Sequence, residues 1–160
     1  MPRYAPLTTR VLLEKAIILA TEAHRGQLNK VGDMPYILHP LRVMAALNDG
    51  TDSEECRKDM IVGILHDVVE DTYITLEILK SEGFTDDLLQ DIDNLSHIDN
   101  EPGEIYCARI RRSARGIRVK DKDLDDNTSD ERMNNLDVDT LTRLSIKYTK
   151  YRKWIHQNDS

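Results

Sequence analysis

The chain has 160 residues, of which 22 are lysine or arginine and 29 are aspartate or glutamate, so its formal net charge is −7. This length suits one domain over residues 1–160, with a core from about 8 to 156, and the negative charge argues against general binding to duplex nucleic acid. No apolar run approaches the roughly 18 residues of a membrane span, and no secretory signal is expected at the start of the chain. The two cysteines give no disulfide framework. A reducing, cytoplasmic setting is therefore expected.

Apolar residues repeat with the spacing of helices along most of the chain, and no segment alternates with the two-residue period of strands. The first helix is expected over 8–26, with Thr8 or Thr9 as its N-cap. A loop over 27–35 follows, and a second helix is expected to begin near Pro40, which suits a first helical turn.

A third helix is expected after Ser53, a candidate N-cap, and should carry the apolar residues 60–69. Thr75 is the expected start of a short fourth helix, and an amphipathic stripe predicts another helix over 85–97.

Residues 104–126 are consistent with one helix or with two abutting helices, and 127–137 with a polar loop. In the last helix, apolar residues between 141 and 155 recur at alternating spacings of three and four, as in a helix laid on a core. A coiled coil is the alternative, but two heptads are too few to support one. The predicted fold is therefore an all-α bundle of about seven or eight helices.

The stretch 63–72 holds an unusual polar cluster. If this stretch is one continuous helix, turning about 100° per residue, His66 shares a face with Glu70, Asp67 and Asp71, and the opposite face is apolar. The simplest interpretation is a solvated acidic face with an incidental histidine. A divalent cation is the functional alternative, because it would remove the repulsion among the carboxylates.

Gly63 lies beneath this cluster, and a glycine inside a helix costs about 1 kcal/mol, so we expect it to allow a close approach. A metal site needs further ligands, for which His39 and the carboxylates of 120–127 are candidates. Two imidazoles with two carboxylates suit a borderline-hard ion such as Mn²⁺, Fe²⁺ or Zn²⁺.

Several segments together resemble the HD-domain metal phosphohydrolases, and within them the RelA/SpoT-type hydrolase domains and the stand-alone small alarmone hydrolases. They are AHRGQ at 23–27, PYILHP at 35–40, LHDVVEDT at 65–72 and DLDDN at 123–127, with a Tyr/Arg/Lys-rich closing helix. The resemblance covers roughly 14–155.

The resemblance implies an HD-type helical bundle whose metal ligands are His39, His66, Asp67 and Asp123. Mn²⁺ is the usual ion in that group, with Fe²⁺, Zn²⁺ and Co²⁺ as alternatives. The resemblance also implies that Glu70 and Asp71 form an acidic pair, which acts on the metal-bound water and on the reacting phosphate. The expected substrate contacts are Lys30, Asn29, Lys120, Asn127, Tyr106 and Arg109.

The expected activity is that of a (p)ppGpp 3′-pyrophosphohydrolase acting on a small-molecule nucleotide, in a hydrolase-only protein without a synthetase domain. One position departs from the family pattern, because Asn29 stands where an arginine normally packs against the nucleobase. Hydrolysis of another nucleotide, such as a nucleoside triphosphate or the 2′-phosphate of NADPH, is therefore the main alternative.

A nucleic-acid- or partner-binding module built on the basic segment 104–122 is a further, less favoured alternative. Most arginines of this segment are expected to pair with acidic residues, among them 86–93, and only Lys120 is expected to face the metal.

Overall fold

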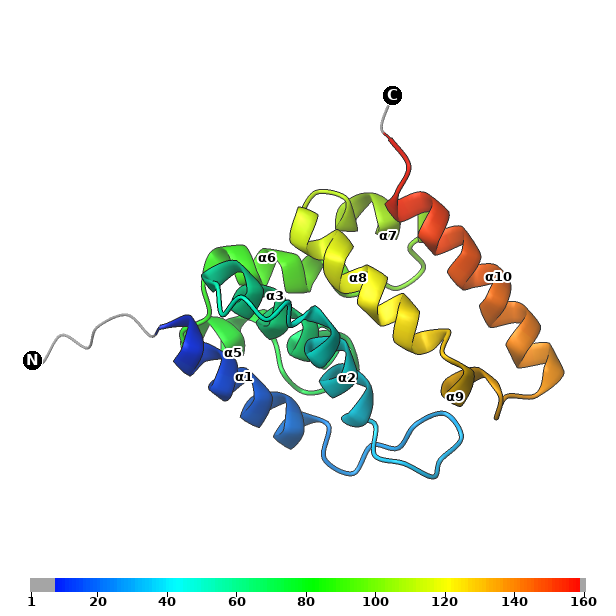
Figure 1. Ribbon diagram of the computed structural model, residues 1–160, viewed down its shortest axis with the longest axis horizontal. Helices are drawn as coiled ribbons and strands as arrows, with labels where there is room; N and C mark the ends of the chain where they lie inside the picture. The colour runs from blue at the N-terminus through cyan, green and yellow to red at the C-terminus, as the bar shows by residue number, and fades with distance from the viewer. Residues whose placement is uncertain (1–7, 159–160) are drawn as a thin grey trace, which may run out of the picture.

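The computed structural model describes residues 8–158, and within that range the chain is all-helical, without a strand (Figure 1). The helices are α1 Thr9–Ala23, α2 Leu38–Leu47, α3 Glu54–Leu65, α4 Val68–Asp71, α5 Leu76–Ser81, α6 Asp86–Leu95, α7 Gly103–Ile110, α8 Ala114–Asn127, α9 Asp130–Met133 and α10 Val138–Ile155. The all-α prediction is confirmed. The predicted count was too low because α4 and α9 are single turns, too short to show a periodic pattern.

The predicted helix starts are confirmed where a side chain caps the first turn. The hydroxyl oxygens of Thr8, Ser53 and Thr75 accept hydrogen bonds from backbone N–H groups at the starts of α1, α3 and α5. The helix α2 begins at Leu38, slightly earlier than expected, and keeps Pro40 within its first turn. The segment 104–126 forms two helices, separated by a turn.

The prediction of one continuous helix across the polar cluster was wrong. The helix α3 ends at Leu65, and α4 begins at Val68 after a turn. Nδ1 of His66 lies 2.6 Å from the carbonyl oxygen of Gly63, the acceptor that the N–H of Asp67 would need if the helix continued. The imidazole therefore replaces a backbone donor, and the helix ends there.

The helix α3 lies at the centre of the molecule, packed against α1, α2, α6 and α8. A Cβ atom on Gly63 would lie 2.5 Å from the side chain of Leu47 and 3.4 Å from the Cα of Met44. The close approach predicted at this glycine is therefore that of α2.

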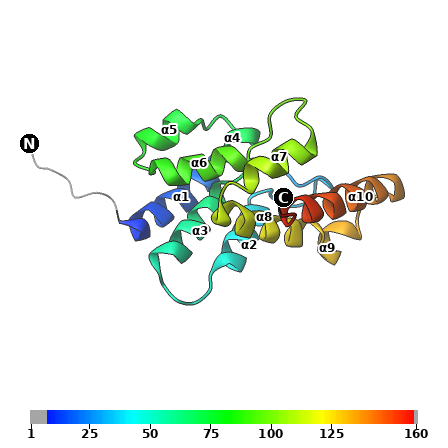
Figure 2. The same ribbon diagram turned by 90° about the horizontal axis from the view of Figure 1, so that it is seen from above.

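The helix α8 separates two groups of helices: α2 and α3 lie on one side of it, and α7 and α10 on the other (Figure 1). In the view turned by 90°, α4, α5 and α6 form a layer above α1 and α3 (Figure 2). One face of α10 is buried through Leu144, Tyr148, Tyr151 and Ile155, so the last helix packs on the core as expected. No helix of the described range is long and apolar enough to cross a lipid bilayer.

Candidate active site

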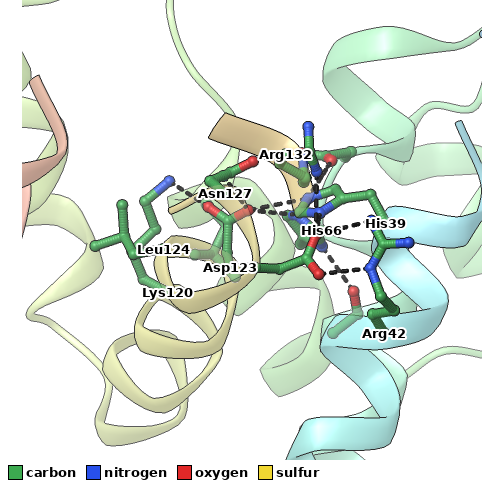
Figure 3. A network of polar contacts seen from close by, with 12 residues as sticks. His39, Arg42, His66, Lys120, Asp123, Leu124, Asn127 and Arg132 are labelled. Carbon is green, nitrogen blue, oxygen red and sulfur yellow. Dashed lines mark hydrogen bonds and ion pairs between the residues drawn. The ribbon is translucent and has the colours of Figure 1, made fainter. Parts of the chain in front are cut away.

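Two histidines and two aspartates converge from three segments that are distant in sequence. Nε2 of His39, on α2, lies 3.0 Å from Oδ1 of Asp123, on α8. Nε2 of His66 lies 3.1 Å from Oδ2 of Asp67 and 3.4 Å from Oδ1 of Asp123. Figure 3 shows the two imidazoles and the α8 carboxylate facing one another. The four residues predicted as metal ligands are therefore brought together.

The second ring nitrogen of each histidine is held by an acceptor. Nδ1 of His66 faces the carbonyl oxygen of Gly63, which can only accept, so Nδ1 carries the proton. Nδ1 of His39 lies 2.6 Å from Oδ2 of Asp126, a carboxylate. In the neutral form of both rings, the lone pair is then on Nε2, the nitrogen that faces the cluster.

This donor set fits a divalent cation. Nε2 of His66 is buried without a hydrogen-bond partner of good geometry in the described structure, although buried polar atoms are normally satisfied. Nitrogen atoms of His39 and His66 and a carboxylate oxygen of Asp123 all lie within 4.8 Å of one another. Two imidazole nitrogens with carboxylate oxygens are ligands for ions such as Mn²⁺, Fe²⁺ and Zn²⁺.

Two side chains orient Asp123. Its Oδ2 accepts a hydrogen bond of 2.7 Å from Lys120, and its Oδ1 accepts one of 2.9 Å from Asn127. Burial alone would raise the pKa of Asp123, but Lys120 and the two imidazoles hold it well below its usual range. The ammonium of Lys120 also lies over the rings of Tyr106 and Tyr151, at 5.2 and 5.6 Å.

The predicted acidic pair lies on the single turn α4, beside this cluster. Burial and the neighbouring carboxylates raise the pKa of Asp71 to about 6. Burial also raises the pKa of Glu70, whose Oε2 accepts a hydrogen bond of 3.1 Å from the backbone N–H of His97. The raised pKa brings Asp71 closer to the range in which a carboxyl group exchanges protons near neutral pH, and the pKa of Glu70 is shifted in the same direction.

A cavity of about 300 Å³ opens above the four converging residues. Of the six predicted substrate contacts, four line it: Lys30, Lys120, Asn127 and Tyr106. The hydroxyl of Tyr106 is already used, because it donates to the carbonyl oxygen of Leu95 at 2.7 Å. Its ring stacks on the imidazole of His97, with centroids 3.7 Å apart.

The other two predicted contacts do not line this cavity. The guanidinium of Arg109 is held by Glu101 and by backbone carbonyls. The side chain of Asn29 is held in its own loop, where it bonds to Asp33 and to the N–H of Gly32. Asn29 lines instead a smaller adjoining hollow of about 90 Å³.

Several residues at the site were not among the predicted ligands, acidic pair or substrate contacts, although Asp126 belongs to the candidate segment 120–127. Tyr36 lies within the segment PYILHP and Asp126 within DLDDN. Each is close in sequence to a predicted metal ligand, and this closeness is the feature that could have identified it. Arg132, Lys147 and Tyr148 also line the cavity, from α9 and α10. They lie in segments whose only signal was a general richness in charge and tyrosine.

The arginines of the basic segment are mostly paired with acidic residues, as expected. Arg115 lies 2.7 Å from Asp91 and 3.2 Å from Asp59, and Arg118 lies 2.6 Å from Asp59. These ion pairs join α8 to α3 and α6, so acidic partners within the domain neutralise the charge of these two arginines.

The all-helical arrangement is the HD-type helical fold, which the chain shares with a solved structure. A solved structure described as a metazoan ortholog of SpoT that hydrolyzes ppGpp superimposes with a TM-score of 0.76 and 19% identity, covering 96% of this chain and 89% of that one. No family model matches the chain.

Comparison with curated proteins identifies relatives of this chain by sequence. The chain is 36% identical over 123 residues to a probable GTP pyrophosphokinase of Mycobacterium leprae, covering 72% of this chain and 15% of the relative. It is 41% identical over 73 residues to the GTP pyrophosphokinase rsh of Brucella melitensis, covering 46% of this chain and 9% of the relative. The chain thus spans a small part of the length of these proteins. It is a relative of the RelA/SpoT proteins with an HD-type fold.

Proposed function

We propose that this chain is a metal-dependent hydrolase of phosphorylated nucleotides, and that its reaction is the removal of pyrophosphate from the 3′ position of (p)ppGpp. The observation that carries the proposal is the convergence of His39, His66, Asp67 and Asp123 at the floor of a cavity with basic residues in its walls. The names of these relatives, GTP pyrophosphokinases, concern guanine nucleotides and support the same substrate class.

These four residues would hold the cation through Nε2 of each imidazole and through the carboxylates. When bound, a divalent cation supplies Lewis-acid activation of water and of a phosphate oxygen. Mn²⁺ is the proposed ion, with Fe²⁺, Zn²⁺ and Co²⁺ as alternatives that the same donor atoms accept.

The acidic pair supplies the proton transfer. A water oxygen attacks the phosphorus, the bond from phosphorus to the ribose 3′ oxygen breaks, and the nucleotide leaves with a 3′ hydroxyl. Glu70 accepts the proton of the attacking water, and Asp71 orients that water or returns a proton to the departing oxygen. Lys120 balances the negative charge of Asp123 at the cavity wall and keeps that carboxylate oriented.

The basic walls suit the phosphates that do not react. Lys30 and Lys147 both line the cavity, and in the described structure neither ammonium forms an ion pair. Burial and repulsion by Lys147, Arg132 and Arg143 lower the pKa of Lys30. A ligand with several phosphate groups would relieve this repulsion.

A second candidate is an HD-type hydrolase for another nucleotide, such as a nucleoside triphosphate or the 2′-phosphate of NADPH. The hydrogen bonds of Asn29 to Asp33 and Gly32 favour it, because they occupy the side chain at the position where the family's arginine packs on a base.

One experiment tests both candidates. The purified protein is analysed for bound metals and then assayed with Mn²⁺ against ppGpp, pppGpp, nucleoside triphosphates and NADPH. Pyrophosphate released from ppGpp supports the main proposal, and orthophosphate from NADPH or triphosphate from a nucleoside triphosphate supports the second. His66→Ala should abolish metal retention and turnover, and His156→Ala, an exposed histidine of α10's C-cap, is its control. Absence of both metal and turnover in the unmodified chain contradicts the hydrolase proposal.

The cellular setting and extent of the domain are also proposals. Both cysteines, Cys56 and Cys107, are free and buried, which suits a reducing cytoplasm. The core side chains between Leu12 and Ile155 form one cluster, in keeping with a single domain whose partner is a small-molecule nucleotide.

A further inference from the structure

The carboxylate of Asp126 lies behind His39, on the side away from the cavity floor. Its Oδ2 lies 2.6 Å from Nδ1 of His39. Its Oδ1 accepts a hydrogen bond of 2.6 Å from Nε of Arg42, and its Oδ2 accepts bonds from Arg42 at 3.2 Å and from Arg132 at 3.1 Å. Figure 3 shows Arg42, Arg132 and His39 lying close together.

These contacts determine which nitrogen of His39 carries its proton in the neutral ring. Two guanidinium groups donate to the carboxylate of Asp126, so this carboxylate is ionised and can only accept. Nδ1 of His39 must then donate to it. The lone pair of the imidazole is thereby directed through Nε2, which lies 3.0 Å from Asp123 and 3.6 Å from Asp67.

The two arginines also hold the carboxylate in place. Arg42 lies on α2, one turn after His39, and Arg132 lies on α9, so three helices meet at Asp126. Asp126 makes four such contacts, to His39, Arg42 and Arg132, and it does not line the cavity. Its neighbour Asp125 points elsewhere: its side chain is 55% exposed and pairs with Arg152.

We propose that Asp126 is a positioning residue that sets the tautomer and the orientation of His39 for cation binding, and that Arg42 and Arg132 hold Asp126 for this task. The inference rests on the proposed function, because it concerns the same cation. Asp126 acts through His39 and contacts neither the cation nor the substrate.

Metal affinity is the first test. Binding of Zn²⁺ and Mn²⁺ to the metal-free full chain is measured by isothermal titration calorimetry for the unmodified protein, Asp126→Asn and the control Asp125→Asn. Because loss of a group that orients a metal-bound histidine commonly costs 10–100-fold in metal affinity, we expect a loss on the order of 10–100-fold for Asp126→Asn and none for Asp125→Asn. Equal affinity of the unmodified protein and Asp126→Asn overturns the proposal.

The protonation of His39 is the second test, and it needs neither a variant at Asp126 nor a metal. Long-range ¹H–¹⁵N correlation spectra of the metal-free protein, recorded at a pH above the imidazole pKa and assigned with His39→Asn, report which ring nitrogen carries the proton. A proton on Nδ1 in the unmodified protein supports the proposal, and a proton on Nε2 overturns it even if Asp126→Asn fails to fold.

The two kinds of failure are distinguishable. If the unmodified protein binds no metal, the proposed function fails, and the spectra still report the tautomer of His39. If the unmodified protein binds metal and His39 carries its proton on Nε2, the role of Asp126 fails while the hydrolase proposal stands.

Discussion

The hydroxyl of Tyr36 donates a hydrogen bond of 2.5 Å to Oδ2 of Asp67, the same oxygen that lies 3.1 Å from Nε2 of His66. Burial, reinforced by the charge of Asp67, raises the pKa of Tyr36, so the hydroxyl keeps its proton and remains a donor. Tyr36 therefore orients Asp67 through the carboxylate oxygen that also lies beside His66.

Tyr36→Phe should weaken metal binding while leaving the fold intact. A hydrogen bond to a charged group contributes about 1.5–3 kcal/mol, so a loss of roughly tenfold or more in affinity is expected. Calorimetric titration with Mn²⁺ measures it. Tyr73→Phe is the control, because Tyr73 is 68% exposed. Unchanged affinity in Tyr36→Phe would contradict the assignment of Asp67 as an oriented ligand.

Metal binding should release protons and strengthen as the pH rises. Burial alone would lower the pKa of His66, but Asp67 and Asp123 more than offset it and raise this pKa well above its usual value. Below the raised pKa the imidazole is protonated, and the cation must displace that proton. Titrations in buffers of different ionisation enthalpy count the protons released. An affinity that does not change with pH would be inconsistent with histidine ligands.

The acidic pair should produce the acidic limb of the rate profile. Because the pKa of Asp71 is raised to about 6 in the metal-free site, its carboxylate is lost as the pH falls through that value. A bound cation stabilises the carboxylate, so kcat/KM should fall at or below pH 6 in the active protein. Asp71→Asn should change the position of this limb, because Glu70 is then the only member of the pair that titrates. Glu70→Gln should retain metal but lose roughly 10²-fold or more in kcat, and an unchanged kcat would remove Glu70 from the mechanism.

Lys147 should contribute to substrate affinity rather than to chemistry. Its side chain lines the cavity, and its ammonium lies 5.3 Å from the ring centroid of Tyr151. Lys147→Met should raise KM for a nucleotide with several phosphates by roughly tenfold, the size of one charge-assisted hydrogen bond, with little change in kcat. Lys150→Met, an exposed site on the same helix, is the control. If Lys147→Met and Lys150→Met have equal KM values, the phosphates of the substrate do not contact Lys147.

Arg109 should support folding. Its guanidinium makes two hydrogen bonds to Glu101, at 2.7 and 2.8 Å, and others to the carbonyl oxygens of Asp93 and Ser96. Arg109→Met removes these donors and leaves the buried Glu101 carboxylate without its cationic partner, so urea unfolding should show a loss of about 3–5 kcal/mol, as for other buried pairs that lose one partner. Arg112→Met, at an exposed position, should cost little. An Arg109→Met variant as stable as the unmodified protein would contradict this role.

The same pair has a defined pH dependence. The hydrogen bonds from Arg109 lower the pKa of Glu101 in the folded protein. The resulting stabilisation is fully present above the pKa of the unfolded chain and is lost as the pH falls through the folded value. The difference in stability between the unmodified protein and Glu101→Gln should therefore shrink on acidification. A difference that stays constant through this range would show that ionised Glu101 is not what Arg109 stabilises.

The helix starts were predictable because their signals are local. Thr8, Ser53 and Thr75 each cap a first turn within three residues of their own position, so the backbone partner is known as soon as the pattern is seen. The break at His66 was not predictable from periodicity, because it arises from a side-chain hydrogen bond to the carbonyl of Gly63. A helical wheel assumes that no such bond forms.

The amino-acid sequence by itself determined the helical class, the caps and the residue types of the candidate metal site, because these follow from short-range spacing and from the chemistry of the motifs. Only the tertiary structure decided that Asp126 contacts His39, that Arg109 is directed away from the cavity, and that Lys147 lines it. Each depends on how α2, α7, α8 and α10 pack. Contacts between helices far apart in the chain leave no periodic pattern along the sequence, whereas the burial of each helix's own apolar face does.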